Sequence, residues 1–226
     1  MSDDKFQRLE LLIGTENFSK LTAATVAVFG IGGVGSFTVE ALARCGIGHL
    51  VLIDRDNVDT SNINRQIHAL TTTVGRSKVE VMRERIQQIN PAAKVETIQK
   101  FLLPNENAED FFVCRYDYVV DAIDTLSAKI FLIEECTRRG IKIISSMGAG
   151  NKLDPTRFRV SDVFQTSVDP VAKIMRKKLR ERGINRLKVV WSDENPLPVK
   201  NFIGSVSFVP SVAGLIIAGE VVRDLT

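Results

Sequence analysis

A glycine-rich segment, Gly30-Ile-Gly-Gly-Val-Gly35, stands between an apolar run and an amphipathic one. Glycines lack a Cβ, so a phosphate group can approach the backbone closely, and a helix that begins there adds free N–H groups and the positive end of its dipole. Asp54 ends the next apolar run, 19 residues beyond Gly35, where a carboxylate can accept hydrogen bonds from ribose hydroxyls. The pattern predicts a nucleotide site, with a tight packing turn as the alternative. The glycines alone do not distinguish NAD from ATP. The four candidate residues of this segment are Gly30, Gly32, Gly33 and Gly35.

Polar side chains are dense in the segment that follows Asp54. Arg65 can direct two N–H groups at one phosphate and Lys78 offers a compact charge, a combination suited to a triphosphate. Asp124 follows a later apolar run and could hold Mg²⁺ that is bridged to phosphate oxygens. For any one of these residues, a solvated loop charge remains the alternative interpretation.

Short apolar runs that alternate with helical patterns must position these residues. Alternating strands and helices imply right-handed crossovers, and so predict an α/β, Rossmann-like, doubly wound and mainly parallel sheet. The expected strands are Thr25–Gly30, His49–Ile53, Lys94–Ile98, Tyr116–Ala122 and Ile141–Ser146. The expected helices between them are Gly33–Cys45, Ser77–Asn90 and one that Asp124 or Thr125 caps and that runs through Arg139.

After Gly150 the regular alternation of strands and helices ends, and a C-terminal extension of short strands and helices is expected. Strands are expected at Phe158–Phe164 and Leu187–Ser192, and a last helix at Pro210–Asp224. No linker is evident, so we expect one domain over residues 1–226, with a nucleotide-binding half (1–150) and a substrate-binding half (151–226). Between the two strands a helix begins at Asp169-Pro170 and ends near Gly183. Its expected inward residues are Val171, Ile174, Met175 and Leu179, and its outward cations are Lys173, Arg176, Lys177 and Arg180.

The net charge of +3 conceals one strongly basic segment. Residues 173–188 hold eight basic side chains and one acidic one, a balance of +7, so the remaining 22 basic and 26 acidic side chains give −4. Such a segment could contact an RNA backbone, although a solvated helix face is the plain alternative. The charged first residues do not resemble a secretory signal, and the uncharged stretch 201–219 contains Pro210, which favours a buried helix over a membrane span. We therefore expect a cytoplasmic protein.

Together, GIGGVG, LIDRDNVDTSNINRQ, GRSKVE and DAIDT resemble the ubiquitin-activating-enzyme superfamily of ATP-dependent adenylyltransferases. The resemblance implies that ATP is bound with Mg²⁺, that Gly32 and its neighbours line the phosphate loop, and that Asp54 binds ribose. It also implies that Asn62, Arg65 and Lys78 contact phosphates, and that Asp124 holds the catalytic Mg²⁺. Arg8 matches an arginine that reaches into the partner subunit's ATP site, so a homodimer is expected, and Arg8, Arg65, Lys78 and Asp124 become the candidate catalytic residues.

The sequence departs from two branches of that superfamily. It has no CxxC pair, so no structural zinc is expected, and its cysteines (Cys45, Cys114 and Cys136) all precede Gly150, which excludes a thioester-forming cysteine in the second half. FRVSDVFQTSVDPVAKIMRKKLRERGI, KVVWSDENP and GSVSFVPSVAGLIIAGEVV resemble instead the branch that uses ATP to cyclise threonylcarbamoyladenosine in tRNA. That likeness implies a tRNA partner, with Lys173, Arg176, Lys177 and Arg180 on its backbone, and an accessory or sulfur-relay protein is conceivable.

Three other functions remain open at this point. One is an adenylyltransferase that activates the C-terminal Gly-Gly of a sulfur-carrier or ubiquitin-like protein, although such members usually carry the zinc cysteines that are missing here. The second is an NAD-dependent oxidoreductase, which has no evident need for Arg65, Lys78 and Asp124 around its pyrophosphate. The third is a non-catalytic RNA-binding protein.

Overall fold

The computed structural model describes residues 5–103, 108–198 and 203–226. Its centre is a seven-stranded sheet in the order β3-β2-β1-β4-β5-β7-β6. All neighbouring strands are parallel except β6, which pairs antiparallel with β7 at one edge. The strands are β1 (Thr25–Phe29), β2 (His49–Ile53), β3 (Lys94–Ile98), β4 (Tyr118–Asp121), β5 (Lys142–Ser146), β6 (Phe158–Asp162) and β7 (Lys188–Ser192).

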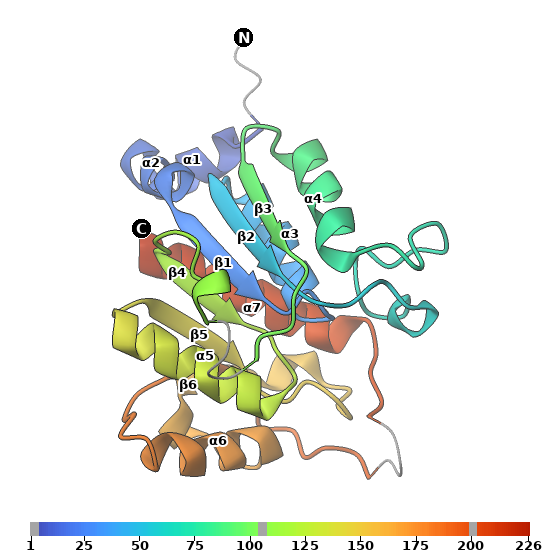
Figure 1. Ribbon diagram of the computed structural model, residues 1–226, viewed down its shortest axis with the longest axis vertical. Coiled ribbons are helices and arrows are strands. Elements are labelled where there is room, and N and C mark those ends of the chain that lie inside the picture. Colours follow the sequence, from blue (N-terminus) through green and yellow to red (C-terminus); the bar gives the residue numbers. More distant parts are fainter. Residues whose placement is uncertain (1–4, 104–107, 199–202) are drawn as a thin grey trace.

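Helices cover both faces of this sheet (Figure 1). The α-helices are α1 (Gln7–Ile13), α2 (Thr15–Ala23), α3 (Gly35–Arg44), α4 (Lys78–Ile89), α5 (Leu126–Arg139), α6 (Pro170–Arg180) and α7 (Phe208–Leu225). One apolar core joins α2, α3, α4 and α7 to one face, while α5 and α6 pack on the other. Along β1, Val26 and Val28 point into the first core and Ala27 and Phe29 into the second, as a strand buried on both faces requires. The predicted doubly wound α/β fold is confirmed.

The strand predictions were accurate where an apolar run is bounded by polar or glycine residues. The predicted bounds of β2 and β3 are those observed, whereas β4 is shorter than the predicted 116–122 and β6 ends at Asp162, where a 3-10 turn (Val163–Gln165) begins. Helices α1 and α2 were not predicted; both are short, and Leu21 is the one residue of the two helices that is buried.

The second half of the chain adds strands to the same sheet as the first half. Residues Ile144–Ser146 of β5 pair in parallel with Lys188–Val190 of β7. Lys188 Nζ lies 2.8 Å from Asp224 Oδ2, which ties β7 to the last turn of α7. Within the described residues, no helix is both long and apolar enough to cross a membrane. Most of the uncharged stretch 201–219 forms part of α7, which packs into the core, and its first two residues lie outside the described ranges.

Candidate nucleotide and acceptor site

A cavity of about 560 Å³ opens at the carboxyl ends of the central strands. The chain leaves β1 toward β2 on one side and returns to β4 on the other, so a crevice forms where the strand order reverses. The predicted residues that line this cavity are Gly30, Gly32, Gly33, Asp54, Asn62, Arg65, Lys78 and Asp124. Residues 146–150, after β5, line the same cavity. The fold therefore brings together groups that stand more than a hundred positions apart in the sequence.

The glycine loop joins β1 to α3, as predicted. Gly30 has a φ of +87°, and a Cβ there would lie 2.6 Å from the carbonyl oxygen of Ala122. A Cβ on Gly35 would lie 1.8 Å from the carbonyl oxygen of Gly30, so the packing of the loop itself requires glycine at both positions. At Gly32, by contrast, a Cβ would meet only Gln66 Nε2, at 3.9 Å. No side chain caps the first turn of α3, so this helix N-terminus is open to an anion, and the N–H of Ser36 donates to the carbonyl oxygen of Gly32 (3.0 Å).

Backbone hydrogen bonds fix Asp54 beside this loop. Its Oδ2 accepts a hydrogen bond from the N–H of Ile31 (2.7 Å), and its Oδ1 accepts one from the N–H of Asp56 (2.8 Å). Burial raises the pKa of Asp54, and the Lys78 cation opposes that rise. Each carboxylate oxygen keeps a lone pair for a further donor, so the predicted ribose contact is geometrically available.

Lys78 and Asn62 enter the cavity from the segment between β2 and α4. Lys78 is the first residue of α4 and is buried, and its Nζ lies 3.1 Å from Asp56 Oδ2. Asn62 is also buried, and its Oδ1 accepts a hydrogen bond from the N–H of Asp59 (3.0 Å) in a capping box. A buried cation with one partly exposed carboxylate partner is well suited to neutralising phosphate charge.

Arg65 and Asp124 line the same cavity. Arg65 Nη1 donates to the carbonyl oxygen of Ser61 (2.8 Å) and to Asn64 Oδ1 (2.9 Å), which holds the guanidinium in place while its other N–H groups remain available. Asp124 is exposed, and its Oδ1 accepts a hydrogen bond from Thr125 Oγ1 (3.3 Å). Thr125 precedes α5 but makes no side-chain cap, so the predicted capping of this helix was wrong for both residues.

A buried ionic network, which the sequence patterns did not predict, lies beneath this cavity. Lys129, on the first turn of α5, lines the cavity and donates to Asp121 Oδ2 (2.8 Å), Ser145 Oγ (3.1 Å) and the carbonyl oxygen of Ser146 (2.9 Å). The side chains of Lys129 and Asp121 are almost completely buried. A lysine on an amphipathic helix gives no local sign of such partners, because they belong to strands β4 and β5.

Arg8 lies apart from the other candidate residues. It is exposed on α1 and is absent from the described lining of the cavity. No group of three or more histidine, cysteine, aspartate or glutamate side chains that could hold a metal ion occurs in residues 5–103, 108–198 and 203–226. Asp124 is thus a carboxylate of the cavity lining that belongs to no such group among the described residues. Such a donor fits Mg²⁺, which is commonly bound by one or two carboxylates together with substrate phosphates.

The basic helix α6 differs from its predicted faces. Ile174, expected inward, is 42% exposed, and Ala172 is buried in its place, because α6 packs on α5 along the side of Ala172, Met175 and Leu179. Arg176, expected outward, is half-buried, and its Nη1 donates to the carbonyl oxygen of Thr166 (3.0 Å).

The other three predicted cations of α6, Lys173, Lys177 and Arg180, are exposed. The Arg180 guanidinium lies over the Phe164 ring, 5.0 Å from its centroid. The side chains of Lys173 and Lys177 are exposed, and their ammonium groups make no hydrogen bond or ion pair with the described part of the chain.

A Rossmann-like sheet with a glycine loop, an acidic residue at the end of β2 and cations beyond it defines a nucleotide-binding protein of the adenylate-forming type. The ThiF family model matches residues 6–226, so the chain belongs to the ThiF family. This confirms the resemblance drawn from the sequence motifs.

Two relatives match almost the whole chain. The chain is 48% identical to the tRNA threonylcarbamoyladenosine dehydratase of Bacillus subtilis (strain 168), over 98% of this chain and 94% of that protein. The solved E. coli tRNA N6-threonylcarbamoyladenosine dehydratase, TcdA, in complex with ATP, superposes with a TM-score of 0.93 at 37% identity, over 98% of this chain and 93% of that one.

The likeness to the alternative class is shorter. The adenylyltransferase and sulfurtransferase UBA4 of Vanderwaltozyma polyspora is 35% identical over 67% of this chain, but the match covers only 36% of that protein.

Proposed function

We propose that this protein is an ATP-dependent enzyme that dehydrates threonylcarbamoyladenosine in tRNA to a cyclic form. The observation that carries the proposal is the 48% identity to a dehydratase over 94% of that relative's length, which spans both halves of the chain. The cavity supports it, since groups suited to ATP and residues of the second half line one continuous space.

The proposed reaction has two steps. A carboxylate oxygen of the threonyl group attacks the α-phosphorus of ATP, a new P–O bond forms, and pyrophosphate leaves. The carbamoyl nitrogen or oxygen then attacks the activated acyl carbon, AMP leaves with the former carboxylate oxygen, and the nucleophile loses its proton. Together, the two steps remove one water equivalent at the expense of ATP. AMP makes this possible because it leaves far more readily than hydroxide would.

The residues of the cavity supply positioning and charge for these steps. Asp54 would hold the ribose, while Lys78, Arg65 and the uncapped N-terminus of α3 would hold the phosphates. Asn62 would contact a phosphate beside them. Asp124 would hold Mg²⁺, which supplies neutralisation of phosphate charge when it is bound. We expect most of the rate enhancement to come from this fixed arrangement.

No cysteine is needed in this mechanism. Burial raises the pKa of the Cys45, Cys114 and Cys136 thiols, and so disfavours the thiolate that a covalent step would need. Cys45 and Cys114 are half-buried and Cys136 is fully buried, away from the cavity lining.

The two halves of the chain would divide the work. Residues 1–150 would bind the nucleotide, and residues 151–226 would bind the tRNA within the same domain. The exposed Lys173 and Lys177 on α6 are the best placed for an RNA backbone, with Arg180 beside them, whereas Arg176 would first have to leave Thr166. We place the protein in the cytoplasm, and an accessory protein partner stays a prediction.

A homodimer would complete the site. Arg8 is exposed on α1, and the same helix exposes the apolar side chains of Leu11 (80%) and Leu12 (83%). A partner surface over Leu11 and Leu12 would remove that apolar area from water and carry Arg8 toward the partner's cavity.

AMP release with defined acceptors tests the proposed function. The protein is incubated with ATP and Mg²⁺, together with threonylcarbamoyladenosine-containing tRNA, the same tRNA lacking the modification, or a carrier protein that ends in Gly-Gly. We expect AMP only with the modified tRNA, in amounts equal to the cyclic nucleoside found by mass spectrometry after digestion. AMP formed with the carrier protein instead would contradict the proposal and favour the sulfur-carrier class.

A further inference from the structure

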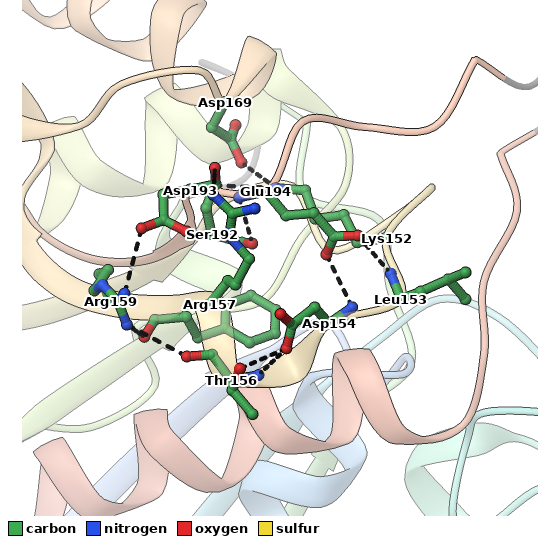
Figure 2. Close-up of polar contacts among 11 residues, drawn as sticks. Lys152, Leu153, Asp154, Thr156, Arg157, Arg159, Asp169, Ser192, Asp193 and Glu194 are labelled. Atoms are coloured by element: carbon green, nitrogen blue, oxygen red, sulfur yellow. Dashed lines mark hydrogen bonds and ion pairs between the residues drawn. The ribbon is translucent and has the colours of Figure 1, made fainter.

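A second buried ion pair lies behind the cavity wall, between Lys152 and Asp169. Lys152 is 3% exposed and Asp169 is 1% exposed, and Lys152 Nζ lies 3.4 Å from Asp169 Oδ2. The same ammonium donates to the carbonyl oxygen of Ser192 (3.2 Å), as Figure 2 shows. The pair therefore joins the segment after β5, the start of α6 and the end of β7.

Asp169 also fixes the start of α6. Its Oδ1 accepts a hydrogen bond from the N–H of Ala172 (2.9 Å), and it follows Val168, whose φ of +52° is a strained conformation for a β-branched residue. The helix cap and the ion pair thus hold the carboxylate in one place. The surrounding packing must also offset the unfavourable backbone conformation of Val168.

The ion pair lies next to residues that line the cavity. A Cβ added to Gly148 would lie 3.3 Å from Asp169 Oδ2 and 3.4 Å from Val171 Cγ2. Gly148 and Val171 both line the cavity, so the carboxylate lies immediately behind this part of the wall. Any shift of Asp169 would move a surface that a bound molecule touches.

This part of the wall lies away from the nucleotide groups. Asp54 follows β2, whereas Gly148 follows β5, which stands three strands further along the sheet. At the usual spacing between strands, that is a separation of roughly 14 Å. A nucleotide with its ribose at Asp54 and its phosphates at the glycine loop would leave the space over β4 and β5 to the acceptor.

We propose that Lys152 and Asp169 are positioning residues that hold the wall formed by Gly148 and Val171 against the acceptor nucleoside, so that its carboxylate meets the α-phosphate. This inference rests on the proposed function for the identity of the acceptor. Buried ion pairs contribute little net stability compared with neutral groups of similar shape, so a neutral replacement is expected to fold while the wall loses its fixed position.

The test uses a neutral double variant. Asp169→Asn keeps an oxygen for the Ala172 N–H, and Lys152→Met removes the cation that would otherwise be buried without a counter-ion. The single variant Asp169→Asn is measured beside it. The matched control is Arg157→Met with Asp193→Asn, which breaks a nearby ion pair (2.7 Å) whose arginine side chain is 45% exposed (Figure 2).

We expect the neutral double variant to bind ATP with a Kd within about twofold of wild type, and one ATP per active site. The kcat for AMP release with modified tRNA should fall at least tenfold, while the KM for tRNA changes less than about threefold, because the nucleoside is bound but misplaced. The control should leave all three values unchanged. A kcat that stays at the wild-type value in a folded double variant, or an equal loss of ATP binding and kcat, would overturn the proposal.

Hydrogen exchange separates this inference from the proposed function. In the double variant, amides of residues 147–151 and 171–173 should exchange faster, and those of residues 30–36 should not. If wild-type protein releases no AMP with modified tRNA, the proposed function fails, and the exchange pattern alone then decides whether the Lys152–Asp169 pair holds the wall in place. Unchanged exchange at residues 147–151 would refute this positioning role of the Lys152–Asp169 pair, whatever the activity.

Discussion

Lys129 Nζ lies 2.8 Å from Asp121 Oδ2, and this buried contact joins the first turn of α5 to the last residue of β4. Asp121 Oδ1 also accepts a hydrogen bond from the N–H of Ile123 (3.1 Å). The short loop that carries Asp124 is therefore fixed at both ends, by β4 and by α5. An exposed carboxylate is presented to the cavity from a rigid base.

Replacing Asp124 by Asn should abolish most AMP formation without unfolding the protein. The amide has nearly the same shape but lacks the negative charge for Mg²⁺. The rate should fall more than tenfold, a loss above ~1.4 kcal/mol in transition-state stabilisation. Melting temperature and ATP affinity, measured in parallel, should change little. Glu84→Gln, which removes a surface carboxylate paired with Arg76, is the control. A rate above a tenth of wild type would show that Asp124 is not the essential ligand.

Arg8→Ala and Lys78→Ala proteins should each be inactive alone, yet partly active when mixed. If Arg8 acts across a dimer, a mixed dimer contains one site with both side chains intact. Random exchange of subunits would give such dimers as about half of the total, so recovery of up to about a quarter of wild-type sites is expected. Tagged chains establish that subunits exchange. Exchange without recovered activity would exclude the action of Arg8 in a partner's site.

The lysines of α6 should control the salt dependence of tRNA binding. Each phosphate contact contributes a slope of about −0.7 to −0.9 in log affinity against log salt, so Lys173→Gln with Lys177→Gln should flatten the slope by about 1.5 units. Lys178→Gln is the control, since Lys178 already pairs with Glu181 at 3.0 Å. Arg176→Gln should mainly lower the melting temperature, because Arg176 holds Thr166. An unchanged slope in the folded double variant would make α6 a solvated face.

Burial of His68 should make the protein lose stability in mild acid. The side chain is 2% exposed, neither ring nitrogen has a hydrogen-bond partner in the described structure, and burial, followed by the Lys78 and Arg85 cations, lowers its pKa to about 4. The unfolded chain binds a proton near pH 6.5 whereas the folded chain does not, so the free energy of unfolding falls as pH decreases from 6.5 to 4.

The expected contribution is about 3 kcal/mol, at 1.36 kcal/mol for each unit of pKa difference. His68→Leu should flatten the dependence of stability on pH in that window, as measured by urea unfolding at a series of pH values. His49→Gln is the control, because His49 Nε2 already contacts Glu96 Oε1 (3.1 Å). The idea fails if the wild-type and His68→Leu curves keep the same slope.

The sequence allowed prediction of those features that depend on local pattern. The apolar runs gave β2 and β3 with their observed bounds, and the glycine spacing gave the loop between β1 and α3. Asp54, Lys78 and Asp124 could be assigned to one site because the carboxyl ends of parallel strands meet at one edge.

Features that depend on distant partners could not be predicted. Ile174 has helical spacing suited to a core, but its exposure depends on how α6 crosses α5. Lys129 and Lys152 read as ordinary surface lysines, because their carboxylate and carbonyl partners stand 8 to 40 residues away in the sequence. Arg176 was predicted to point outward from its helical spacing. Its hydrogen bond to the carbonyl oxygen of Thr166 depends on the conformation of the loop before α6, which the spacing does not show.

The glycines of the loop between β1 and α3 meet two different requirements, the packing of the chain and access for a ligand. At Gly30 and Gly35, even a methyl group would collide with backbone atoms, so the fold requires these glycines whether or not a nucleotide is bound. At Gly32 a methyl group would meet only the side chain of Gln66 at ordinary contact distance, while facing the cavity. Gly32→Ala should therefore leave the stability of the folded chain unchanged, and should obstruct a nucleotide that enters the cavity. A substitution at Gly32 can therefore separate nucleotide binding from folding.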